Sequence, residues 1–154
     1  MIRVAFVCHG NICRSTLVQS VFTYKVQELG LGTQFVIDSF ATSAEELGNP
    51  PHSGTVRKLQ EVGIPVVPHR AKQISWSDYD NFDYIIGMDG WNIRNLYMIL
   101  KGDPEKKVHK LLTFAGSERD IADPWYTGNF DATYNDALEG CEGFLDYLRS
   151  NGDI

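Results

Sequence analysis

The sequence predicts an α/β fold, a three-layer sandwich in which helices cover both faces of a central parallel sheet of four to five strands. Two observations support this prediction. Strand-like and helix-like segments alternate along all 154 residues. The clearest strand-like runs are apolar almost without interruption, as in parallel strands that are buried on both faces. The chain contains no repeat, low-complexity tract or linker, so we expect a single domain over residues 1–154.

The first half of the chain is predicted to contain two strands and two helices. In chain order, we expect a buried strand (2–7), a helix (15–29), a strand from 35 to the region of 41–43, a loop (48–51), a helix from Ser53 or Thr55 to Gly63, and a short extended piece (64–68). Leu17, Val21 and Tyr24 share one face of the first helix, as amphipathic helices require. The prolines at 65 and 68 suit the edge of a sheet or the end of a strand.

The second half continues the alternation. We expect a strand (83–88) with a turn at Asp89-Gly90, a helix (91–100), a strand (108–114) and a terminal helix that begins at Asp131. Alternating strands and helices of this length imply right-handed crossovers. Since ligands of such sheets bind beyond the carboxyl ends of the strands, we expect the functional site at that edge.

The composition excludes several classes of protein. A net charge of −6 does not suit a general nucleic-acid surface, which needs clustered Lys and Arg. No apolar segment is long enough to cross a membrane, and the N-terminus lacks the layout of a signal peptide. Three cysteines, an odd number, do not suit a secreted disulfide framework, so we expect a cytoplasmic protein. No Cys or His residues have the spacing of a zinc site, and we expect no bound metal.

The segment after the first predicted strand reads Cys8-His9-Gly10-Asn11-Ile12-Cys13-Arg14-Ser15. A turn between a strand and a helix aims several backbone N–H groups at one point, where the helix dipole adds positive charge. Arg14 adds a planar donor suited to two phosphate oxygens. These donors favour the thiolate of Cys8 and hold a tetrahedral anion against it. The pattern therefore indicates phosphatase chemistry with Cys8 as the nucleophile.

Three further residues of this segment suit a tight loop around an anion. Gly10 allows the backbone to approach the anion closely, and Asn11 tolerates a left-handed conformation. Ser15 can donate its hydroxyl hydrogen to the sulfur of Cys8. We therefore expect all three to shape the loop.

Phosphoryl transfer also needs a proton donor for the leaving oxygen, and Asp123 is the candidate. Pro124 follows it, which disfavours helix at Asp123 and places it on an extended or turning loop. Trp125 and Tyr126 can wall a slot for an aromatic leaving group. A correctly placed acid contributes about 10²–10⁴ in rate.

These motifs resemble those of the low-molecular-weight protein-tyrosine phosphatases. The likeness rests on residues 8–15 and 123–126 and covers essentially the whole chain. It implies that Cys8 forms a cysteinyl-phosphate, that Arg14 binds the phosphoryl oxygens, and that Asp123 protonates the tyrosyl oxygen and then activates water. The residues expected to bind substrate are His9, Gly10, Asn11, Ile12, Cys13, Ser15, Trp125 and Tyr126.

The same resemblance implies further properties. His69 would support the loop by hydrogen bonding, and Cys13 would pair reversibly with Cys8 under oxidation. The expected activity is hydrolysis of phosphotyrosine in proteins and of small aryl phosphates, with inorganic phosphate as product and with no metal or organic cofactor. The expected partners are phosphotyrosine-containing proteins, with no nucleic acid and no membrane, and the expected state is a monomer.

Three alternative functions stay open. A protein-arginine phosphatase shares the fold and the loop, but that group tends to have threonine at the position of Ile12. An arsenate reductase relays electrons through cysteines that follow the strand over 83–88, whereas residues 87–100 contain none. A non-catalytic phosphate-binding module would not need an intact nucleophile, arginine and acid. Two departures from the family pattern, Phe40-Ala41-Thr42-Ser43 and Glu45-Glu46-Leu47, concern the cleft wall and leave the peptide preference open.

Overall fold

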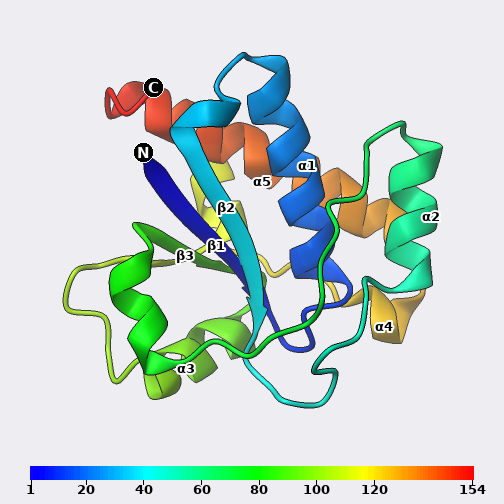
Figure 1. The fold of residues 1–154 in the computed structure, drawn as a ribbon, viewed down its shortest axis with the longest axis horizontal. Coiled ribbons are helices and arrows are strands. Elements are labelled where there is room, and N and C mark those ends of the chain that lie inside the picture. Colours follow the sequence, from blue (N-terminus) through cyan, green and yellow to red (C-terminus); the bar gives the residue numbers. More distant parts are fainter.

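Four parallel strands form the centre of the fold, which a computed structural model describes over residues 1–154 (Figure 1). They are β1 (Ile2–Cys8), β2 (Phe35–Ala41), β3 (Tyr84–Gly87) and β4 (Val108–Lys110), in the spatial order β2-β1-β3-β4. All three strand pairings are parallel. The predicted parallel sheet of four to five strands is therefore confirmed.

Helices cover both faces of this sheet. They are α1 (Arg14–Glu28), α2 (Ser53–Glu61), α3 (Gly90–Ile99), α4 (Pro124–Thr127) and α5 (Phe130–Ser150), with the 3₁₀ helices η1 (Gly32–Gln34), η2 (Trp76–Asn81) and η3 (Leu111–Ala115). α1 and α5 lie together on one face, and α3 lies on the other (Figure 1). This arrangement is the predicted three-layer sandwich. None of the helices is both long enough and apolar enough to cross a membrane.

The position of β1 between two helical layers explains why its sequence is continuously apolar. Val4 and Phe6 belong to the core formed with α1 and α5, whereas Ala5 and Val7 belong to the core formed with α3. All four side chains are fully buried. Because successive side chains of a strand point to opposite faces, a central strand between two helical layers needs apolar residues at every position.

The strand predicted over 108–114 is shorter than expected. β4 ends at Lys110, and η3 follows it directly. Leu111 and Leu112 are adjacent, yet both are fully buried in the core that contains α5. A strand would point them to opposite faces, so a helical turn replaces it. Gly140 on α5 permits this close packing, since a Cβ there would lie 2.5 Å from Leu111 Cγ.

The extended piece predicted over 64–68 forms no strand of the sheet. Pro65 and Pro68 lack the backbone N–H that a strand ladder requires. The carboxyl end of β2 is instead extended by an isolated parallel bridge between Ala41 and Gln73. The predicted piece is therefore neither an edge strand of the sheet nor the end of one of its strands.

Three aromatic rings surround Phe22 on α1. Its ring centroid lies 5.5 Å from that of Phe6, 5.4 Å from that of Phe35 and 5.3 Å from that of Phe144 on α5. The Phe22 side chain is fully buried. It therefore joins the sheet to both helices of this layer.

We expect Phe22→Ala to lower the free energy of unfolding by about 3–5 kcal/mol, because it removes buried apolar surface and leaves a cavity. Denaturant unfolding measures the change. Met98→Ala is the control, since Met98 is 71% exposed and should cost less than about 0.5 kcal/mol. Equal losses in the two variants would contradict the central role of Phe22.

Candidate active site

The Cys8 loop, residues 8–15, begins at the last residue of β1 and ends in the first turn of α1. β1 lies between β2 and β3, so the chain must cross β1 when it passes from β2 to β3. The strand order reverses beside β1, and ligands of open parallel sheets bind at such a position. The structure places Cys8 there, at the carboxyl edge of the sheet.

Asn11 holds the Cys8 loop in shape. It is fully buried, and its φ of 59° lies in the left-handed region. Its backbone N–H donates to Cys8 Sγ at 3.3 Å, and its Nδ2 donates to Ser15 Oγ at 2.8 Å and to Ser39 Oγ at 2.9 Å. Its Oδ1 accepts from the backbone N–H of Lys72 at 3.2 Å. These bonds determine the orientation of the amide and the path of the loop.

His69 supports the loop from behind through Asn11. Its Nε2 lies 2.7 Å from Asn11 Oδ1, which accepts, and 3.2 Å from Ser39 Oγ. Burial lowers the pKa of His69; the carboxylate of Asp38 opposes this effect and Lys72 adds to it. The neutral imidazole therefore carries its proton on Nε2, where the amide oxygen needs a donor.

The two thiols of the Cys8 loop differ in their surroundings. The Cys8 thiol donates to Ser15 Oγ at 3.1 Å. As a thiolate it would accept from the Ser15 hydroxyl and from the Asn11 N–H. Burial, reinforced by the charge of Cys8, raises the pKa of Cys13 to about 12, so Cys13 stays protonated at neutral pH. Cys141 is fully buried in the core of α5, as its apolar helix face suggests.

Arg14 is a buried cation, and one of its nitrogen atoms has no hydrogen-bond partner. It is 2% exposed, and its Nη1 donates to Asp89 Oδ2 at 2.6 Å and to the Ile121 carbonyl at 2.9 Å. Burial opposes its charge, but Cys8 and Asp89 outweigh burial and raise the pKa of Arg14. Its Nε is buried without a hydrogen-bond partner. Since buried donors are nearly always satisfied, this atom indicates a place for an oxyanion.

The acid loop, residues 121–126, brings the carboxyl group of Asp123 beside Arg14. Asp123 Oδ2 accepts from Arg14 Nη2 at 3.4 Å, and Oδ1 accepts from the backbone N–H of Trp125 at 3.0 Å. Asp123 has extended backbone angles and caps α4, which starts at Pro124. The sequence predicts the extended conformation of Asp123 but not the short helix after it.

A pocket of about 100 Å³ opens in front of Cys8. Its lining residues are Cys8, His9, Gly10, Ile12, Cys13, Glu45, Glu46, Asp123, Trp125 and Tyr126. Eight of these were predicted as site residues from the sequence. The other predicted residues lie behind the lining and hold it, as the contacts of Asn11, Arg14, Ser15 and His69 show. Nowhere does the structure gather three or more His, Cys, Asp or Glu side chains able to hold a metal ion.

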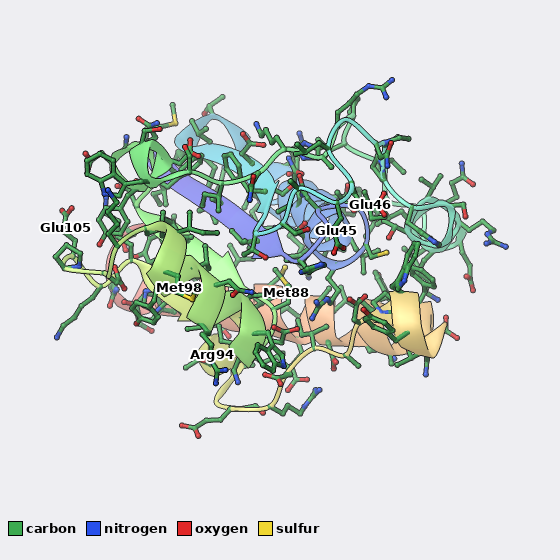
Figure 2. The ribbon with its side chains drawn as sticks, turned by 90° about the horizontal axis from the view of Figure 1, so that it is seen from below. Glu45, Glu46, Met88, Arg94, Met98 and Glu105 are labelled. Carbon is green, nitrogen blue, oxygen red and sulfur yellow. The ribbon has the colours of Figure 1, made fainter.

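One wall of the pocket is acidic. Glu45 and Glu46 lie together on the loop after β2, over the end of the sheet (Figure 2). Glu45 Oε2 lies 2.9 Å from Nε2 of His9, which is half exposed at the rim. The Glu46 side chain approaches Gly10, where an added Cβ would lie 3.4 Å from Glu46 Cγ. Of the sequence departure at 45–47, Glu45 and Glu46 therefore do lie in the cleft wall.

Comparison with known proteins identifies the family. Residues 3–153 match the sequence profile described as "Low molecular weight phosphotyrosine protein phosphatase". The chain belongs to this family. A low molecular weight protein-tyrosine-phosphatase, PtpA of Staphylococcus epidermidis, is 36% identical over 155 residues, covering 100% of this chain and 98% of the relative.

Solved structures of related proteins have the same fold. The crystal structure of YfkJ from Bacillus subtilis superposes with a TM-score of 0.94 at 37% identity, covering 98% of this chain and 96% of that one. The structure of DARP, described as a Drosophila arginine phosphatase, superposes with a TM-score of 0.87 at 29% identity and covers 96% and 98%. As a protein-tyrosine phosphatase of this family, the chain is a cysteine-dependent hydrolase.

Sequence reasoning missed one residue of this phosphatase site. Asp89 was predicted only as a turn residue, yet its carboxylate pairs with the buried Arg14 and also caps α3 by accepting from the Asn92 N–H at 2.8 Å. Its position directly after a predicted strand was the available sign, because the carboxyl ends of parallel strands share one edge.

The buried His69 should make stability depend on pH. Because its folded pKa lies below its ordinary value, the unfolded chain takes up a proton that the folded protein rejects as pH falls below about 6.5. Folding stability therefore decreases on acidification through this range. We expect His69→Gln, whose amide can still donate, to flatten the dependence of Tm on pH between about pH 5 and 7. An unchanged slope would contradict a neutral His69.

Proposed function

We propose that the protein hydrolyses phosphotyrosine in proteins, and small aryl phosphates, in two steps with Cys8 as the nucleophile. The observation that carries this proposal is that Cys8 and Asp123 line one pocket, while the buried Arg14 behind them donates to Asp123 and keeps an Nε without a partner. Asp123 is 109 residues from Arg14 in sequence. The fold, and not local sequence, therefore brings the acid to the nucleophile.

In the first step the thiolate of Cys8 attacks phosphorus. The S–P bond forms while the bond from phosphorus to the tyrosyl oxygen breaks, and protonated Asp123 gives its proton to that oxygen. Arg14 and the loop N–H groups hold the other phosphoryl oxygens as negative charge develops. Trp125 and Tyr126, which line the pocket, form the wall beside the aromatic ring.

In the second step water attacks the phosphorus of the cysteinyl-phosphate. Asp123 takes the proton from that water, the S–P bond breaks, and inorganic phosphate leaves. The departing thiolate accepts hydrogen bonds from the hydroxyl of Ser15 and the N–H of Asn11. Apart from the attacking water, both steps use only side chains and backbone groups of the protein, with no cofactor.

The state of the thiols supports a reducing compartment. Cys8, Cys13 and Cys141 are all free, and the mechanism requires Cys8 in reduced form, so we place the enzyme in the cytoplasm. Cys13 lines the same pocket as Cys8. After an oxidant such as peroxide has converted Cys8 to a sulfenic acid, the Cys13 thiol can displace water from it and form a reducible disulfide.

Replacing the nucleophile tests the proposal directly. We expect Cys8→Ser to abolish hydrolysis of p-nitrophenyl phosphate, because a serine hydroxyl in this setting is a far weaker nucleophile. Phosphate or vanadate binding, measured by calorimetry, should persist because Arg14 and the loop amides are intact. Turnover near the wild-type rate in this variant would show that another group performs the attack.

The arginine-phosphatase alternative is tested by comparing two phosphopeptides of the same sequence. The pocket carries the apolar Ile12, which is 7% exposed, where that group tends to have threonine. We expect kcat/KM for the phosphotyrosine peptide to exceed that for the phosphoarginine peptide by at least about tenfold. We expect Ile12→Thr to narrow the ratio. A wild-type preference for phosphoarginine would reverse the assignment of substrate.

A further inference from the structure

His52 lies between the two loops that carry the reacting groups. It is the N-cap residue of α2, and its Nδ1 accepts from the backbone N–H of Gly54 at 2.9 Å. Its own backbone N–H donates to the carbonyl of Ile12 at 2.8 Å, while Thr55 Oγ1 donates to the carbonyl of Cys13 at 3.1 Å. The first turn of α2 is therefore bonded directly to the Cys8 loop.

The ring of His52 contacts two aromatic side chains, Trp125 of α4 and Phe130 at the start of α5. It stacks on Phe130 with centroids 5.5 Å apart and an interplanar angle of 21°, and it meets Trp125 edge-on at 5.6 Å. Phe130 packs on Gly54, where an added Cβ would lie 2.3 Å from the ring. The backbone of α2, the imidazole and both rings thus form one packed unit.

Trp125 connects this unit to the acid. Its backbone N–H donates to Asp123 Oδ1 at 3.0 Å, so the position of Trp125 sets the direction of the carboxyl. The Trp125 side chain is 55% exposed, which leaves few contacts to hold it. Before Asp123, the acid loop is anchored by Arg14 at Ile121. After Asp123, the ring of His52, whose backbone is bonded to the Cys8 loop, contacts the ring of Trp125.

We propose that His52 is a positioning residue for the general acid. It fixes Trp125 relative to the Cys8 loop, and the Trp125 N–H then orients Asp123 toward the leaving oxygen. His52 itself does not touch the reacting atoms. The inference rests on the proposed function, since it assigns His52 a part in the proton transfer performed by Asp123.

The leaving group distinguishes a positioning role from a merely structural one. Phenyl phosphate needs a proton on its departing oxygen, whereas p-nitrophenolate leaves readily without one, so loss of acid catalysis affects the first ester more. We expect His52→Asn to lower kcat/KM for phenyl phosphate about tenfold more than for p-nitrophenyl phosphate. This difference should be smaller than the one caused by complete loss of the acid. Asn keeps the N-cap acceptor and removes only the ring.

Three further variants complete the experiment. Asp123→Ala removes the acid completely, so the loss of kcat/KM for phenyl phosphate relative to p-nitrophenyl phosphate should be larger than in His52→Asn. His52→Phe keeps an aromatic ring but loses the N-cap acceptor. The ratio of kcat/KM for the two esters should therefore stay near the wild-type value, while Tm falls by a few degrees. His109→Asn removes a histidine ring from a different aromatic cluster, with Tyr84 and Phe114, and should leave the ratio unchanged.

The outcomes separate the two proposals. If His52→Asn lowers kcat/KM for both esters equally, or for neither, the positioning role is wrong while the phosphatase function stands. If His109→Asn changes the ratio as much as His52→Asn does, the effect is general destabilisation and the positioning role is also wrong. If the wild-type protein hydrolyses neither ester, the proposed function fails, and the role of His52 fails with it.

Discussion

The structure depends on keeping the guanidinium of Arg14 charged beneath the surface. Removing such a cation from water costs several kcal/mol unless its partners are well placed. Here the partners come from separate parts of the fold: Asp89 at the end of β3 and Ile121 and Asp123 in the acid loop. The need to satisfy one cation therefore connects the Cys8 loop, the end of β3 and residues 121–123.

The same constraint explains the division of labour among the acidic residues near the pocket. Asp89 is committed to Arg14 and to the cap of α3, so its carboxylate is not available to substrate. Asp123 shares only a longer contact with Arg14, at 3.4 Å, and lines the pocket. Two aspartates beside one arginine thus differ in role because one is held by short bonds and the other faces the cavity.

Much of the fold was predictable because the burial of strands and helices produces recognisable patterns of apolar residues in the sequence. The apolar run of β1 follows from its burial between two helical layers, and the spacing of Leu96 on α3 and Leu100 at its C-cap follows from their contact with one core. The η3 turn was not predictable, since a stretch such as Leu111-Leu112 suits a strand or a turn equally until the packing on α5 is known. The η2 turn did carry a local sign, the reciprocal cap between Ser75 and Asp78.

The residues of the candidate site likewise divide into those that could be predicted from the sequence and those that could not. Residues whose role depends on local geometry, such as Asn11 with its left-handed φ and Cys8 at the end of a strand, could be inferred from spacing alone. Roles that depend on contacts between distant segments could not. The pairing of Asp89 with Arg14 and the contact of His52 with Trp125 span 75 and 73 positions, and no periodicity in the chain reports such neighbours.

The order of the strands has a consequence for fluctuations of the native state. β1 pairs along its full length with β2 and over four residues with β3, whereas β4 is an edge strand of three residues. Local opening of a sheet starts at short edges and reaches the doubly paired centre last. The amides of β1 should thus be among the slowest to exchange with solvent deuterium, and the strand that carries Cys8 can stay intact while the β4 edge opens.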